Sequence, residues 1–207
     1  MAATRRSKIG SETILVSCAP ELQAQADWLL DVLAQMHASG PSLQDGSRIQ
    51  LGWSILQLKR RLYTGELVVC EPDFTRNPFT DVVEEVTSTL RTLVQQNDLA
   101  QRAGAQPVQI SFQDKIVLTK GCLEHDAICL QRGEVHPEKG DSGWFIGPQG
   151  DRAESPELEA IYAYELVSRR PKLAAALALP SGYMVMASGE NIQTVINASD
   201  EVVLQSE

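Results

Sequence analysis

The chain has 207 residues, 43% of them apolar and 22% charged, and its 18 basic and 27 acidic residues give a formal net charge of −9 at pH 7. This length can bury an apolar core unaided, so we expect a soluble globular chain of one domain or two small ones. The acidic balance argues against nucleic acid as a partner, because phosphate binding depends on clustered lysine and arginine. No window reaches the roughly 18 consecutive apolar residues of a membrane span, so we expect no membrane partner.

The negative charge is concentrated in the second half of the chain. Residues 1–104 hold 10 basic and 12 acidic residues, a net −2, whereas residues 105–207 hold 8 and 15, a net −7. Eight carboxylates fall within 134–165, against only Lys139 and Arg152. Two interpretations stay open: an ordinary solvated face, or a surface from Glu134 to Glu159 that binds a basic partner.

The first 40 residues predict a tail, a strand and a helix. Residues 1–10 are basic and are expected to form a frayed tail, and the apolar run 13–18 predicts a buried strand. Pro20 opens a helix whose apolar positions step by three and four, and this helix ends before Gly40.

Strands and a long helix are expected next. Alternation over 48–55 indicates a strand, and 67–70 is a second apolar run expected to pair with it in antiparallel fashion. The first strand would direct four side chains to one face: Ile49, Leu51, Trp53 and Ile55. An acidic first turn at Asp81 and a helical stripe predict a long helix that ends at Gly104, and the best domain boundary is at 103–107.

The second half predicts further strands and two helices. Strands are expected at 108–112, 115–119, 126–132 and 183–188, and helices at 157–168 and 171–179. Strands run together and helices run together more than they alternate, which favours an α+β fold of antiparallel sheets packed with a few helices. We therefore predict two small subdomains, residues 1–104, an α+β domain of unknown type, and residues 105–207.

One short string resembles a catalytic motif. The run Gly140-Asp141-Ser142-Gly143 matches the start of the nucleophile motif of chymotrypsin-like proteases, which needs a further glycine and a histidine base. Trp144 stands where that glycine belongs, and His37, the upstream histidine, lies at the end of a predicted helix. We interpret the string as a tight turn that places Trp144 in a core.

The sequence contains candidates for two other kinds of site. Cys122, His125 and Cys129, with His136 further on, are possible zinc ligands, but their spacing fits no common zinc site. Carboxylate pairs suitable for glycoside hydrolysis need one member in an apolar pocket, and those here lie among glycine, proline and serine. Three of the four cysteines lie in apolar runs, which indicates free thiols in a reducing cytoplasm. No catalytic residue, cofactor or metal is predicted.

The second half resembles a known family. The elements that carry the resemblance are a strand closing on Arg132, the string Asp141-Ser142-Gly143-Trp144 followed by Phe145 and Gly147, and an acidic segment over 151–159. An Arg-Pro-Lys-Leu run at 170–173, Leu179-Pro180 and Gly182 follow. In this arrangement residues 108–190 resemble the immunity protein family 33 domain.

The resemblance implies a non-enzymatic cytoplasmic antitoxin that binds a cognate toxin of a polymorphic toxin or contact-dependent system, such as type VI secretion. The toxin is expected to present a basic surface. The residues predicted to contact it are Glu134, Glu138, Asp141, Ser142, Trp144, Asp151, Glu154 and Tyr183. Two alternatives stay open: a small enzyme or ligand-binding or metal-binding domain that uses the Asp141-Ser142 turn or the Cys122, His125 and Cys129 set, and a structural or adaptor protein of a secretion system. The oligomeric state is left open.

Overall fold

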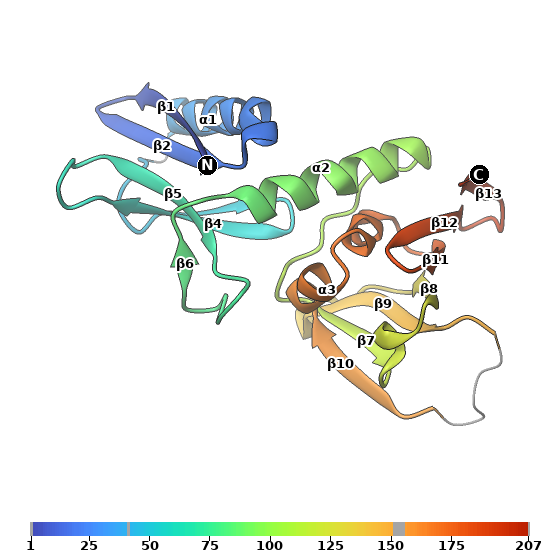
Figure 1. Cartoon of the computed structure of the whole chain (residues 1–207). Coiled ribbons are helices and arrows are strands. Elements are labelled where there is room, and N and C mark those ends of the chain that lie inside the picture. The colour runs from blue at the N-terminus through green and yellow to red at the C-terminus, as the bar shows by residue number, and fades with distance from the viewer. Residues whose placement is uncertain (1, 41, 151–155, 207) are drawn as a thin grey trace. The chain divides into compact units, whose positions relative to one another are not determined.

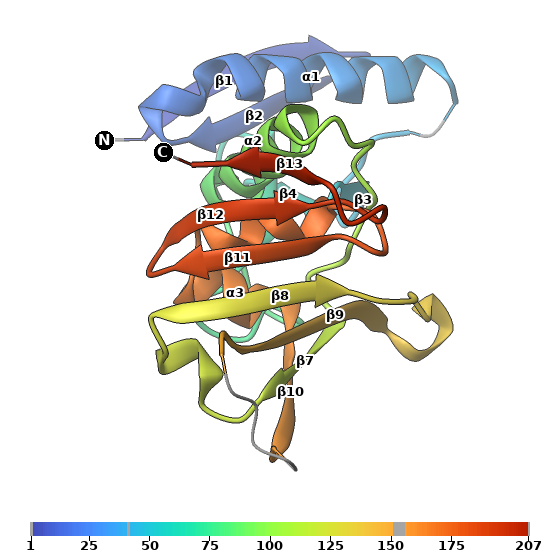
Figure 2. The same cartoon turned by 90° about the vertical axis from the view of Figure 1, so that its right-hand side faces the viewer.

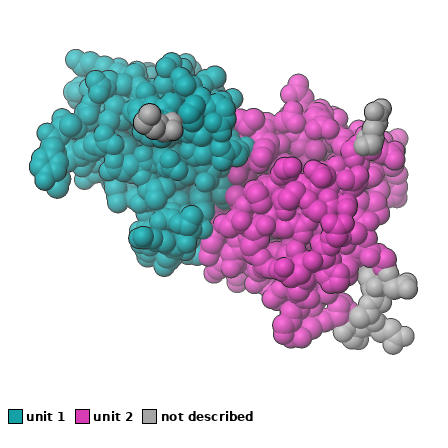
Figure 3. All heavy atoms as spheres, viewed as in Figure 1, with its two compact units in different colours: residues 1–91 teal, residues 92–207 magenta. Residues whose placement is uncertain are grey.

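The computed structural model describes residues 2–40, 42–150 and 156–206. The chain divides into two compact units, Met1–Arg91 and Thr92–Glu207 (Figures 1 and 3). Each unit contains one mixed sheet with helices, which confirms the predicted α+β class. The division falls within helix α2 (Thr87–Arg102), and the predicted boundary at 103–107 stays a prediction.

The first unit is built on a sheet with strand order β1-β2-β5-β4-β3, and a short sixth strand, β6, pairs with β5. All its neighbouring strands are antiparallel except β2 and β5, which are parallel. The strands are β1 (Ala3–Ile9), β2 (Glu12–Cys18), β3 (Arg48–Leu51), β4 (Ser54–Arg60), β5 (Leu67–Pro72) and β6 (Val82–Val83). A 3-10 turn, η1 (Pro20–Leu22), leads into helix α1 (Gln23–Ala38).

Helix α1 packs on β1 and β2 (Figure 1). It buries Ala26, Leu29, Leu30 and Leu33, the three-and-four spacing that predicted it, and the strand over 13–18 is also confirmed. The predicted frayed tail is wrong, because residues 3–9 form edge strand β1. The polar sequence of this segment does not indicate a strand. The strand forms because it pairs with β2, and an ion pair between Arg5 and Asp27 at 2.6 Å adds a contact to α1.

The predicted continuous alternation over 48–55 is also wrong. Gly52, at φ +54°, and Trp53 form a two-residue turn between β3 and β4, since Leu51 pairs directly with Ser54. The turn shifts the alternation of inward and outward side chains in β4. Leu56 of β4 is therefore buried in the core, and Ile55 is only half-buried. The antiparallel pairing of β4 with β5 is confirmed.

The long helix begins six residues later than predicted. The segment at Val82–Val83 pairs with β5, and α2 starts at Thr87. Its first turn is capped by a carboxylate from another element, because Glu71 accepts the Ser88 N–H at 3.1 Å and the Thr89 N–H at 2.6 Å. The acidic residues of 81–85 therefore lie before the helix.

The second unit is built on a seven-stranded sheet of order β10-β7-β9-β8-β11-β12-β13 (Figure 2). All neighbours are antiparallel except β7 and β9. The strands are β7 (Lys115–Thr119), β8 (Ala127–Arg132), β9 (Asp141–Pro148), β10 (Leu158–Tyr162), β11 (Met184–Ser188), β12 (Asn191–Ile196) and β13 (Val202–Gln205). The short helices are η2 (Cys122–Glu124), η3 (Pro137–Lys139), α3 (Ala163–Arg169) and η4 (Leu173–Ala178).

Three predictions for this unit need correction. Residues 108–112 lie outside the strands, and the first part of the predicted 157–168 helix is strand β10, because it pairs with β7 before α3 begins. The Tyr162 N–H donates to the Glu165 carboxylate at 2.7 Å and so marks the true helix start. The second predicted helix is the 3-10 helix η4, whose six residues are all buried. The strands at 115–119, 126–132 and 183–188 are confirmed.

Candidate functional site

The sequence elements behind the family resemblance meet in one buried cluster. Arg132, at the end of β8, is 1% exposed and is surrounded by carbonyls rather than by carboxylates. Its Nε donates to Ser142 O at 3.2 Å, and its Nη1 donates to Leu177 O at 3.3 Å and Leu179 O at 2.5 Å. The guanidinium also lies over the Trp144 ring, 5.8 Å from the centroid, and burial lowers the pKa of Arg132. This side chain therefore ties the C-terminal end of η4 to the sheet.

The Asp-Ser-Gly-Trp string builds a bulge in β9. Three of its residues, 142–144, lie opposite the single residue Ile116 of β7, and Gly143 adopts φ +73°. The Asp141 carboxylate accepts the Gly143 N–H at 2.9 Å, and the Ser142 hydroxyl donates to Lys115 O at 2.6 Å. Trp144 points inward and donates to Leu177 O at 3.1 Å.

Two predicted contact residues are corrected by this arrangement. Ser142 is fully buried and Trp144 is 1% exposed. Both side chains use their polar atoms inside the core, so neither is available to a partner. The prediction that Trp144 lies in a core is confirmed, but the predicted tight turn is wrong, because residues 141–148 form strand β9 and Gly143 lies in a bulge within that strand.

Beside this cluster, three connections lie at one end of the seven-stranded sheet (right-hand end of Figure 2). Residues 133–140 join β8 to β9, 180–183 lead into β11, and 197–201 join β12 to β13. The strand registers require this neighbourhood, because Met184 pairs with both Gln131 and Ile196. We call this region, residues 133–141, 180–183 and 197–201, the acidic end.

Five carboxylates gather at the acidic end without an arginine or lysine partner. Among the described residues, none of the following forms an ion pair with lysine or arginine: Glu134, Glu138, Asp141, Asp200 and Glu201. Glu138 lies 3.7 Å from the imidazole of His136, and the Asp141 and Glu201 carboxylates bind an N–H of Gly143 and Asn197. All are exposed except the half-buried Asp141. The exposed Lys139 lies in the same region, so five carboxylates and one ammonium group leave a net negative charge that is open to solvent.

Carboxylates at the opposite end of the sheet are held by partners. Glu157 pairs with Lys120, Glu124 with Arg169, and Glu190 with Arg170, each at 2.8 Å. Asp126 accepts a hydroxyl from Ser188 at 2.7 Å, and Glu159 accepts the Gly121 N–H at 3.3 Å. The acidic stretch 134–159 of the sequence is thus divided between the two ends of the sheet. The eight residues of β9 separate these two groups of carboxylates by roughly 23 Å.

The structure brings four of the predicted contact residues together. Glu134, Glu138 and Asp141 lie at the acidic end, and so does the half-buried Tyr183. Asp151 and Glu154 lie outside the described residues. Two members were missed by sequence reasoning, Asp200 and Glu201, which are about 60 residues away along the chain.

The alternative sites receive no support from the geometry. Burial raises the pKa of the Cys122 thiol to about 11, which keeps it protonated at neutral pH, and Cys129 lies on β8. Within the described ranges, no group of three or more His, Cys, Asp or Glu side chains is arranged to hold a metal ion. No helix of the described chain is long and apolar enough to cross a membrane.

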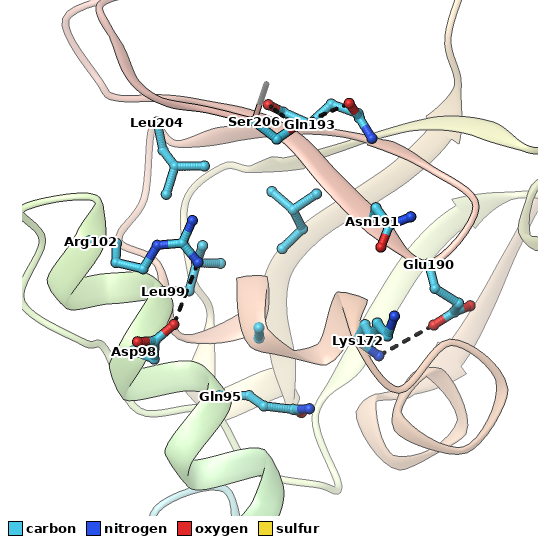
Figure 4. A pocket seen from close by; sticks show the side chains of 12 residues that line it. Gln95, Asp98, Leu99, Arg102, Lys172, Glu190, Asn191, Gln193, Leu204 and Ser206 are labelled. Atoms are coloured by element: carbon cyan, nitrogen blue, oxygen red, sulfur yellow. Dashed lines mark hydrogen bonds and ion pairs between the residues drawn. The ribbon is translucent and has the colours of Figure 1, made fainter.

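One pocket of this unit, with a volume of about 430 Å³ (Figure 4), is lined by none of the residues of the Asp141-Ser142 segment or of the acidic end. Helix α2, η4, β12 and β13 line it. Its carboxylates have partners: Asp98 lies 3.6 Å from Arg102, and Glu190 pairs with Arg170 at 2.8 Å and accepts the Lys172 backbone N–H at 3.3 Å. The pocket therefore differs from the acidic end, whose carboxylates form no ion pair with lysine or arginine among the described residues.

Residues 92–207 thus form a small α+β unit with a buried arginine–tryptophan cluster and an exposed acidic end. A family model, the Imm33-like domain, matches residues 95–198, half of the chain, and the chain therefore belongs to the Imm33-like family. This confirms the resemblance seen in the sequence. No curated protein and no solved structure matches the chain.

Proposed function

We propose that this chain is a cytoplasmic immunity protein that binds and neutralises a cognate bacterial toxin of a polymorphic or type VI secretion system. Membership of the Imm33-like family supports an immunity role. The role needs tight association and no catalysis, so the chain would act as a binding protein and not as an enzyme.

The acidic end is the observation that carries the proposal. Five carboxylates without lysine or arginine partners lie on two of the three neighbouring connections, 133–141 and 197–201. At the opposite end Glu157, Glu124 and Glu190 are held in ion pairs with lysine or arginine. An uncompensated negative patch attracts a basic surface over about a Debye length and raises the association rate. A toxin that acts on an anionic substrate has such a surface at its active cleft.

Tyr183 supplies an anchor for that contact. It lies half-buried at the start of β11, and its backbone is held by Arg132 N, which donates to Tyr183 O at 2.9 Å. A tyrosine on a rigid backbone gives large contact area at a small entropy loss, and such residues are enriched among binding hot spots. The carboxylates would form the polar rim around it.

The test compares charge reversal at the two ends of the same sheet. The protein tested as the toxin is the product of the reading frame next to this gene, because toxin and immunity genes are normally adjacent. Its association rate is measured by stopped flow at 20 and 200 mM salt. The variant Glu134→Lys, Glu138→Lys and Asp200→Lys is expected to associate at least tenfold more slowly at low salt and to lose most of the salt dependence.

The matched control changes the charge by the same amount at the opposite end. It carries Glu124→Lys, Asp126→Lys and Glu157→Lys, and it should associate within about twofold of the unmodified chain. Equal slowing of both variants would mean that only net charge matters, and an unchanged rate in the first variant would refute the proposed surface.

A further inference from the structure

The first unit carries two fully exposed apolar side chains at the tip of its β4–β5 hairpin. Leu62 is 95% exposed and Tyr63 is 102% exposed, whereas the next most exposed large apolar residues of this unit, Trp28 and Phe79, reach 45% and 43%. Adjacent exposed leucine and tyrosine side chains make no contribution to the core. Their position therefore suggests a role in binding.

Hydrogen bonds brace the backbone of this tip. The Arg61 N–H donates to Glu66 O and the Gly65 N–H donates to Arg61 O, both at 2.9 Å, and Gly65 adopts φ +72°. The Arg60 side chain donates to both carboxylate oxygens of Glu12 at 2.9 Å and to Gly65 O at 2.7 Å. A loop ordered before binding loses little further conformational entropy when a partner covers it.

Ion pairs surround the tip. Arg60 pairs with Glu12, Arg61 with Glu84 and Arg6 with Glu66, which leaves these three pairs neutral. Lys8 and Lys59 are exposed and form no ion pair with a described residue. The registers place them with Arg6 on one face of the sheet, since Lys59 pairs with Val68, Val68 with Leu15, and Leu15 with Arg6. The rim is therefore weakly positive on one side.

We propose that the β4–β5 tip is a second anchor, which inserts Leu62 and Tyr63 into an apolar pocket of the toxin whose rim is acidic opposite Lys8 and Lys59. This inference rests on the proposed function and adds a contact made by the first unit. A protein pocket fits better than a lipid surface, because the three rim glutamates already pair with arginines and only Lys8 and Lys59 are left. Two lysines give an anionic bilayer only about 2 kcal/mol of attraction.

The test measures the equilibrium Kd of the full chain for the product of the neighbouring toxin gene. The variant Leu62→Ser with Tyr63→Ser is expected to raise Kd about 100-fold, mainly through faster dissociation, as loss of two hot-spot side chains does. Its melting temperature should not change, because both side chains are exposed. Leu158→Ser with Val108→Ser, at 55% and 38% exposure in the other unit and outside the acidic end, is the matched control and should leave Kd within twofold.

Each outcome separates the two proposals. If the unmodified chain does not bind the toxin, the proposed function fails. If it binds and the tip variant binds equally well, the function stands and the second anchor is refuted. Sedimentation of the unmodified chain with phosphatidylglycerol vesicles, lost in the tip variant, would overturn the protein pocket in favour of a bilayer. Lys8→Glu with Lys59→Glu should raise Kd about tenfold, and an unchanged Kd would refute the acidic rim.

Discussion

Arg132 and Trp144 share one acceptor, and this predicts that their substitutions are not additive. Leu177 O receives the Trp144 indole N–H at 3.1 Å and an Arg132 guanidinium N–H at 3.3 Å. Arg132→Met or Trp144→Phe alone leaves that carbonyl with one donor. Together they leave it buried without any, which costs about 1–3 kcal/mol beyond the sum of the single changes.

The single substitutions have separate magnitudes. Arg132→Met also removes the donors to Ser142 O and Leu179 O, and it relieves the desolvation of a buried charge, so we expect a loss of about 2–4 kcal/mol. Trp144→Phe removes one N–H and part of a buried ring, a loss of about 1–3 kcal/mol. The cation–π contact between the two side chains contributes a coupling energy of the opposite sign, because either single substitution already weakens that contact. At 5.8 Å it is near its limit of about 6 Å, so this effect is the smaller one.

The assay is urea denaturation of the four proteins of the double-mutant cycle, followed by far-UV circular dichroism so that loss of tryptophan fluorescence does not interfere. The expected coupling is about 1 kcal/mol or more, with the double variant less stable than the sum of the single effects. Additivity within about 0.3 kcal/mol, or a coupling of opposite sign, would refute the shared-carbonyl argument.

Two further substitutions test local features. Burial raises the pKa of Glu71 to about 7, against an ordinary 4.5, so its protonation stabilises the fold at low pH and this contribution is lost as pH rises through about 7. Glu71→Gln should therefore gain stability relative to the unmodified chain by up to about 3 kcal/mol between pH 5 and pH 8 in urea denaturation; a constant difference would contradict this. Gly143→Ala should cost about 2–4 kcal/mol, because its Cβ would lie 2.7 Å from Glu134 O at φ +73°. Gly140→Ala, at φ +64° with open space around it, should cost only about 1–2 kcal/mol, and equal melting temperatures for the two variants would count against the steric argument.

Local periodicity was enough to predict part of the regular structure. Helix α1 and strands β2, β5, β8 and β11 have apolar spacings that match their burial, because an element that buries one face needs that spacing wherever it packs. Errors occurred where pairing overrides local pattern. Edge strand β1 has a polar sequence, and β10 begins like a helix but pairs with β7.

The sequence predicted only some of the residues of the candidate site. Glu134, Glu138 and Asp141 are close in the chain, so their charge was visible as a run. Asp200 joins them only because β11 and β12 return to the same end of the sheet. Whether a carboxylate is compensated also depends on side chains from other strands, as the Glu157–Lys120 pair shows.

The sequence by itself determined the α+β class, the family and the excess of negative charge in the second half, because composition and short motifs carry this information locally. It also identified Arg132 and the string ending at Trp144 as a set. Only the tertiary structure decided what that set does: Arg132 bonds to carbonyls 45 and 47 residues later, an arrangement that exists only when η4 packs on the sheet. It likewise divided one acidic stretch into a compensated end and an open one, because strand direction and register decide which charges become neighbours.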